Sequence, residues 1–170
     1  MWIELPKLWI AVINCLGIPA AHLLVAWLSS RLPATTFHPE GFLFRTRAWE
    51  RSGFLYQRVF HVRRWKHRLP DAAPWFQGFA KGKLSSTDPA YLQTFITETC
   101  RGELSHWLQV IAISGFTIIT PYPASLAIIA YSLLSNLPCI INLRHTRIRL
   151  KQILNHSPRS HYCPKQDLLG

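Results

Sequence analysis

The chain has 170 residues, of which 49% are hydrophobic and 12% aromatic, and its formal net charge is +11. A soluble domain with this charge would normally bind nucleic acid, but a mean hydropathy of +0.09 and long uncharged apolar runs argue against a small soluble core. The sequence therefore predicts an all-α integral membrane protein whose basic groups face lipid phosphates, with no nucleic-acid partner.

The first predicted element is a transmembrane helix over residues 8–28. This run contains no Asp, Glu, Lys or Arg, and its length matches the roughly 20 residues needed to cross about 30 Å of hydrocarbon. A cleaved signal peptide is the alternative, but the leader carries Glu4 against Lys7 and lacks a basic n-region. His22, inside the span, is predicted to make a hydrogen bond in helix packing.

Residues 29–103 are predicted to form a cytoplasmic amphipathic section. Between Arg45 and Arg68, basic residues alternate with Trp49, Phe54, Tyr56, Phe60 and Trp65. This mixture suits the headgroup layer, where rings reach the acyl boundary and guanidinium groups contact phosphates. The same pattern also stacks nucleic-acid bases, which the flanking spans disfavour. Further along, Asp88 and Pro89 predict the N-cap and first turn of a helix that continues past Glu98.

A helical hairpin is predicted over residues 104–141. An apolar run over 104–120 is about the minimum length for a span, and the prolines that follow it deny helix hydrogen bonds. A second apolar run covers 124–141, and residues 142–170 form a basic tail. The sequence leaves open whether the hairpin crosses the bilayer or re-enters.

The basic residues predict the orientation of the chain. The leader holds one, residues 29–103 hold twelve and residues 142–170 hold six, which together make the 19 of the whole chain. The positive-inside rule places both basic regions in the cytoplasm. The sequence thus predicts a multi-pass protein with its N-terminus outside and its C-terminus in the cytoplasm.

A polar stripe accompanies the first helix of the hairpin into the membrane. At about 100° per residue, one side of this helix carries Glu98, Arg101, Gly102, Ser105, His106 and Gln109. A snorkelling Arg101 or a structural pair of Glu98 with Arg101 would explain two of these charges. His106 and a second carboxylate, Glu103, favour a functional site, because ionisable groups near a bilayer are costly.

Three blocks carry a resemblance to a known family: FHVRRWKHRLPD at 60–71, ETCRGELSHW at 98–107 and NLPCIINLRHTRIRL at 136–150. In order and spacing they resemble the glycosyl-4,4'-diaponeurosporenoate acyltransferases, small bacterial membrane enzymes of carotenoid biosynthesis. The resemblance implies transfer of a fatty acyl group onto the sugar of a glycosylated carotenoid acid, at a bacterial plasma membrane, giving a staphyloxanthin-like pigment. A non-catalytic membrane subunit or lipid-binding adaptor is the alternative.

Acyl transfer to a sugar hydroxyl requires a base, a donor to the developing oxyanion and positive charge for an anionic carrier. His106 is the first candidate for the base, because histidine titrates near neutral pH, and Glu103 is an i, i+3 neighbour that can orient its imidazole. Glu98, paired with Arg101, is another candidate. The remaining alternative is the H-x-x-x-D spacing of His67 and Asp71, which some soluble acyltransferases use.

The predicted partners are an acyl donor, either a thioester or a phospholipid, a glycosylated lipid acceptor, membrane lipids and a second copy of the chain. The residues predicted to bind substrate are Trp65, Lys66, Asn142, Arg144 and Arg147. A stop-transfer cluster is the alternative reading of the two arginines. No cofactor is expected, and the four cysteines form no C-x-x-C pair, so no metal site is predicted either.

Overall fold

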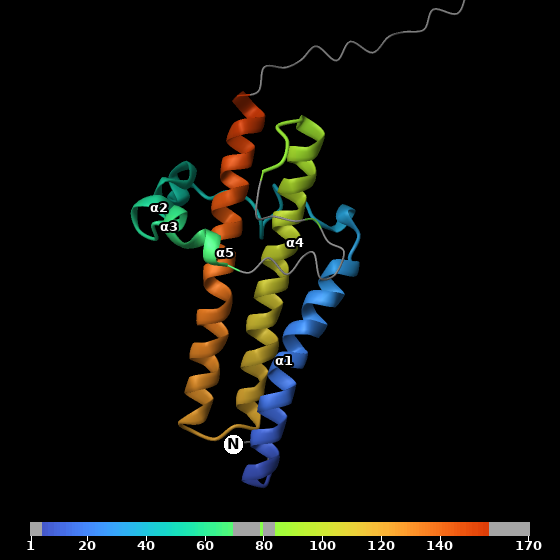
Figure 1. Cartoon of the computed structure of the whole chain (residues 1–170), viewed down its shortest axis with the longest axis vertical. Helices are drawn as coiled ribbons and strands as arrows, with labels where there is room; N and C mark the ends of the chain where they lie inside the picture. Colours follow the sequence, from blue (N-terminus) through green and yellow to red (C-terminus); the bar gives the residue numbers. More distant parts are fainter. Residues whose placement is uncertain (1–4, 70–78, 80–83, 157–170) are drawn as a thin grey trace, which may run out of the picture.

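The computed structural model describes residues 5–69, 79 and 84–156. The described residues contain helices and no strand, which confirms the predicted all-α fold. The three long helices are α1 (Lys7–Arg31), α4 (Pro89–Ser114) and α5 (Ala124–His156). They lie side by side, with α4 packed between α1 and α5 (Figure 1).

Short helical elements fill the segment between α1 and α4: η1 (Ala34–Thr36), η2 (Ala48–Gly53), α2 (Phe54–Arg58), α3 (Val62–Trp65) and η3 (Lys66–Arg68). In Figure 1, α2 and α3 lie beside α5, on its side away from α1. Tyr56 and Val62 are buried there against Ile148 of α5. Gly53 introduces α2 with a φ of +88°, which only glycine adopts without steric cost, and a Cβ there would lie 3.4 Å from Ile148.

Two helices, α1 and α5, are long and apolar enough to cross a membrane, which suggests that the protein is membrane-associated. In the most apolar window of α1 only 6% of the residues are buried. Leu8 and Leu16, for example, are 73% and 70% exposed. The core helix of a soluble protein would be mostly covered, so the surface of α1 suits contact with lipid.

The structure extends α4 well ahead of the predicted hairpin. Asp88 caps it as predicted, because its side chain accepts hydrogen bonds from the N–H groups of Ala90 and Tyr91 at 3.0 and 3.1 Å. Among the described helices, α4 is not one of those that are long and apolar enough to cross a membrane. The charges of the polar stripe explain this, because they leave a regular apolar helix only from Leu104 to Ser114, followed by η5 (Gly115–Ile118).

Helix α5 runs without interruption past the predicted boundary at Ile141 and ends at His156. The first part of the predicted basic tail is therefore helical. At about 1.5 Å per residue the 33 residues of α5 extend about 50 Å, which exceeds the roughly 30 Å of a hydrocarbon core. A basic end of α5 thus projects beyond any bilayer that the helix crosses.

Polar side chains connect α1 to the other long helices at two levels. Asn14 Nδ2 donates to Thr120 Oγ1 at 2.9 Å. Deeper in the bundle, His22 Nδ1 lies 3.0 Å from Gln109 Oε1, and His22 Nε2 lies 3.2 Å from the hydroxyl of Tyr131. These contacts confirm the helix-packing hydrogen bond predicted for His22. Since lipid is as apolar as a leucine side chain, such polar contacts carry much of the specificity of helix association.

Replacing His22 with alanine is expected to weaken the attachment of α1 by about 1 to 2 kcal/mol, because interhelical hydrogen bonds in membranes each contribute about 1 kcal/mol. The change removes both side-chain hydrogen bonds of His22 and leaves Gln109 Oε1 without its imidazole partner, although Gln109 Nε2 still donates to the main-chain oxygen of residue 22 at 3.5 Å. The measurement is the free energy of unfolding by steric trapping in micelles. Leu16→Ala is the matched control, since its side chain is largely exposed, and an equal loss in both variants would contradict the expectation.

Candidate functional site

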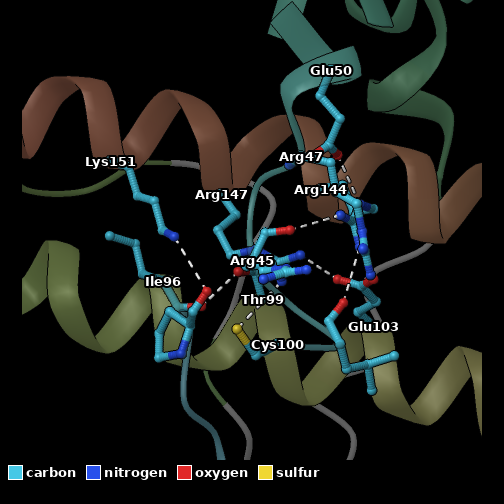
Figure 2. Close-up of polar contacts among 12 residues, drawn as sticks. Arg45, Arg47, Glu50, Ile96, Thr99, Cys100, Glu103, Arg144, Arg147 and Lys151 are labelled. Atoms are coloured by element: carbon cyan, nitrogen blue, oxygen red, sulfur yellow. Dashed lines mark hydrogen bonds and ion pairs between the residues drawn. The ribbon is translucent and has the colours of Figure 1, made fainter. Parts of the chain in front are cut away.

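Four charged side chains meet where α4, α5 and η2 converge (Figure 2). Glu103 comes from α4, Arg144 and Arg147 come from α5, and Glu50 comes from η2. Both carboxylates are 0% exposed and Arg147 is 1% exposed. Burying an ion costs several kcal/mol unless it is paired and hydrogen-bonded, so the partners of these groups decide what they can do.

Glu103 joins the two arginines of α5. Its Oε1 accepts a hydrogen bond from Arg144 Nη1 at 2.7 Å, and its Oε2 accepts one from Arg147 Nη2. Arg147 Nη1 also donates to Cys100 Sγ at 3.3 Å. Cys100 and Glu103 are three residues apart, as are Arg144 and Arg147, so each pair occupies one side of its helix and the two sides face each other.

Arg144 connects three parts of the fold. Its Nε donates to Glu50 Oε1 at 2.9 Å, and its Nη1 reaches Glu103. The remaining donors reach main-chain oxygens, that of Leu43 at 3.3 Å and that of Arg45 at 3.2 Å. Every nitrogen of this guanidinium therefore has an acceptor within the protein.

The substrate-binding role assigned to Arg144 and Arg147 from sequence stays a prediction, and the geometry gives both residues a different task. Their two positive charges are matched by the buried carboxylates of Glu50 and Glu103. A phosphate would have to displace these carboxylates, which are already buried and paired. The network is therefore better suited to holding α4, α5 and η2 together than to binding an anion.

Glu50 is a site residue that sequence reasoning missed. Its carboxylate accepts hydrogen bonds from the N–H of Arg47 and the hydroxyl of Tyr56, both at 2.5 Å, in addition to the one from Arg144. Burial alone would raise the pKa of this carboxyl, but the Arg144 guanidinium, followed by the Tyr56 hydroxyl and the Arg47 N–H, holds the pKa below its ordinary value. The sequence does contain a signal that could have identified Glu50, because it is the single acidic residue between Arg45 and Arg68.

The lowered pKa of Glu50 predicts that the folded protein loses stability in acid. A carboxyl whose pKa is lower in the folded than in the unfolded chain contributes stability above the unfolded value, near 4.5, and loses it as the pH falls through the folded value. Glu50→Gln is expected to lower the free energy of unfolding at neutral pH and to flatten its decline below pH 4.5. Thermal unfolding measured across this pH range checks both, and an unchanged slope in the variant would contradict the assignment.

The predicted pair of Glu98 with Arg101 is present, with Arg101 Nε 3.0 Å from Glu98 Oε1. Arg101 Nη1 also donates to the main-chain oxygens of Ser29 at 3.1 Å, of Ser30 at 3.3 Å and of Leu32. The last carbonyls of a helix lack partners within the helix and carry partial negative charge. Arg101 therefore caps the C-terminal end of α1 from α4.

His106 is half-buried on α4, and its Nδ1 lies 2.9 Å from Asn136 Oδ1 on α5. Asn136 Nδ2 donates to the main-chain oxygen of Ser132 at 2.9 Å and to Ser135 Oγ at 3.1 Å. These bonds occupy the amide nitrogen, so the amide oxygen faces the imidazole and Nδ1 carries the ring proton. Nε2 then carries the lone pair, which is the state of a general base.

The orienting partner of His106 in the structure is thus Asn136, a residue that the sequence analysis did not select. Glu103, which was predicted to orient the imidazole, directs one oxygen to each arginine of α5. Asn136 is itself held in place, because its amide nitrogen bonds to two residues of its own helix, α5.

Three of the other predicted site residues lie in α3 and η3, and α3 packs beside α5. Trp65 is half-buried and its Nε1 donates to the main-chain oxygen of Phe60 at 2.7 Å, while Lys66 and His67 are exposed on η3. Asn142 is half-buried on α5, and Asp71 lies outside the described residues. Within the described part of the chain, no group of three or more His, Cys, Asp and Glu side chains is arranged to hold a metal ion.

Comparison with known proteins gives a consistent family. The model of the glycosyl-4,4'-diaponeurosporenoate acyltransferase family (CrtO) matches residues 39–156. The glycosyl-4,4'-diaponeurosporenoate acyltransferase of Staphylococcus aureus (strain NCTC 8325 / PS 47) is 30% identical over 134 residues, which cover 78% of this chain and 81% of the relative. The enzyme of that name from Staphylococcus haemolyticus (strain JCSC1435) is 32% identical over 131 residues, 76% of each chain. No solved structure matches the chain.

Proposed function

The chain belongs to the glycosyl-4,4'-diaponeurosporenoate acyltransferase family, and from this premise we propose that it moves a fatty acyl group onto a sugar hydroxyl of a glycosylated carotenoid acid or a similar glycolipid. As its family and relatives indicate, the chain is an acyltransferase of carotenoid biosynthesis. The acyl donor is a thioester or a phospholipid. The relatives' names supply the class of acceptor, and the residues below supply the chemistry.

His106 is the general base of this proposal, and the observation that carries it is the bond from its Nδ1 to Asn136. With Nδ1 protonated, Nε2 takes the proton of the sugar hydroxyl while the hydroxyl oxygen attacks the acyl carbonyl carbon. The tetrahedral intermediate then expels the thiolate or alkoxide of the donor. The imidazolium returns its proton to that leaving group, so no covalent acyl-enzyme is required.

The charged network acts as a positioning device in this mechanism. Glu103 lies three residues before His106 on α4, and Arg144 lies eight residues after Asn136 on α5. The ion pairs between them fix the two helices relative to each other, and with them the 2.9 Å contact of the imidazole. Of the predicted substrate-binding residues, exposed Lys66 has a charge that is better placed for a donor phosphate than the buried Arg147.

The same proposal places the site at the inner face of a bacterial plasma membrane. Helix α1 crosses, α4 and the first part of α5 form a hairpin that either crosses or re-enters, and the basic regions face the cytoplasm with the C-terminus. The exposed apolar surface of α1 and the excess of basic residues after it support this topology. Arg101 contacts the C-terminal end of α1 and lies two residues before Glu103, so the charged network lies near the end of the first proposed span.

The test is mass spectrometry of lipid extracts from a non-pigmented bacterial host that makes the chain together with enzymes supplying a glycosylated carotenoid acid. The expected product is heavier than its acceptor by one fatty acyl group and is absent when His106 is replaced by alanine. Membrane abundance of each variant is measured in parallel. An inserted wild-type protein that acylates neither this acceptor nor other glycolipids of the host would favour a non-catalytic membrane subunit.

A further inference from the structure

Large aromatic side chains point outward from the segment between α1 and α4. Their exposed fractions are 75% for Phe42, 55% for Trp49, 56% for Phe54 and 41% for Phe60. We call these four residues the outer face of the segment. None of them belongs to a predicted span, so a bilayer crossed by α1 and α5 does not by itself cover them. Several exposed aromatic rings within one short segment indicate an interaction surface.

The segment has an opposite, inner side that is already covered. Tyr56 and Val62 are 2% and 0% exposed and pack on Ile148 of α5. Phe54 lies two residues before Tyr56 in α2, and therefore about 200° around the helix from it. The packing on α5 thus fixes which side faces away, and it directs Phe54 away from the bundle.

Positive charge surrounds the outer face. The guanidinium groups of Arg45 and Arg47 lie 5.5 and 5.0 Å from the centre of the Phe42 ring, and that of Arg58 lies 6.0 Å from the centre of the Phe54 ring. Residues 41–69 contain eight basic residues and one acidic residue. That acidic residue, Glu50, is fully buried and paired with Arg144, so it does not offset the charge of the surface.

We propose that the outer face binds the anionic headgroup layer of the membrane, with its rings at the acyl boundary and its arginines on lipid phosphates. Aromatic residues interleaved with arginine match both layers of such a surface. Charge complementarity selects lipid over a second copy of the chain, because two copies would bring two cationic faces together. The inference concerns how the segment is held at the membrane and is independent of the catalytic role of His106.

Trp49 provides the test within the full-length protein. The protein is reconstituted in nanodiscs that hold one copy, made of phosphatidylcholine brominated near the carbonyl end of its chains, with or without phosphatidylglycerol. Subtracting the emission of Trp49→Phe from that of the unaltered protein isolates the signal of Trp49. We expect the brominated lipid to quench this signal in discs with phosphatidylglycerol, and iodide in water to quench it little. Trp65→Phe provides the matching difference for a ring that is packed beside α5.

The charge dependence is tested with Arg45→Gln combined with Arg58→Gln. Each basic group near an anionic surface contributes about 1 kcal/mol, so the ratio of docked to undocked segment should fall about fivefold for each arginine removed. Arg31→Gln combined with Arg149→Gln removes the same charge from exposed positions outside the segment and should leave the quenching unchanged.

Three results would count against the proposal. Quenching of Trp49 by iodide and not by brominated lipid, in discs with phosphatidylglycerol, would place the outer face in water. Protection from both quenchers only in discs that hold two copies would make the outer face a contact between chains. Equal loss of lipid quenching in both charge variants would likewise refute a specific role of Arg45 and Arg58. None of these readouts depends on turnover, so the proposed activity stands or falls separately.

Discussion

Replacing His106 with glutamine is expected to lower kcat by about 10²- to 10⁴-fold, the usual contribution of a positioned general base. Glutamine keeps the polar character and approximate length of the side chain but has no nitrogen that accepts a proton near neutral pH. The KM for the acceptor should change little, since the base acts mainly in the transition state. Initial rates with purified protein in lipid discs, with donor and acceptor varied in turn, give both constants.

Asn136 and His67 supply the comparison variants. Asn136→Ala removes the acceptor for Nδ1–H, so the imidazole loses its fixed orientation and kcat should fall by a smaller factor. His67→Gln changes an exposed histidine on η3 and should leave kcat near the unaltered value. A large loss in His67→Gln together with a small loss in His106→Gln would transfer the role of base to His67.

Replacing Glu103 with alanine is expected to cost about 3 to 5 kcal/mol of unfolding free energy, because it leaves Arg147 charged and unpaired in a site where it is 1% exposed. Arg144 would lose one of its two carboxylates but keep Glu50. The variant should therefore accumulate poorly in membranes and unfold at lower temperature in detergent. Thermal unfolding of the purified protein, followed by circular dichroism, measures the loss.

A double variant separates the loss of charge balance from the loss of contact. Combining Glu103→Ala with Arg147→Met removes both members of the buried pair and leaves no buried arginine without its carboxylate at this position, so much of the stability should return. Glu40→Ala is the matched control, since its pair with Lys151 involves a carboxylate side chain that is 80% exposed. Equal losses in the single and double variants would show that the buried pair is not the source of the stability.

Hydropathy and capping rules predicted where the helices lie better than they predicted which residues of different helices contact one another. The absence of charge over residues 8–28 located α1, and Asp88 located the start of α4, because both signals lie within one helix. The end of α5 was missed because hydropathy reports the apolar part of a helix and not the helix itself. Arginines that follow a span can continue it without any break in the backbone hydrogen bonds.

The candidate site likewise shows that signals within one helix are readable from sequence, whereas contacts between helices are not. A helical projection placed Glu98, Arg101 and His106 on one side of α4, but it contains no information on which residues of other helices face them. Asn136 and Glu50 therefore could not be selected. Glu50 forms its ion pair with a residue 94 positions later in the chain, which is a contact that only the tertiary fold defines.

That separation also orders the events of synthesis. Glu50 is made before α4 and α5, so its carboxylate has no arginine from α5 to pair with until nearly the whole chain has left the ribosome. Until then α2 and α3 also lack the surface of α5 on which they pack. The segment that holds Glu50, α2 and α3 can therefore reach its final structure only after the last long helix, α5, has been made.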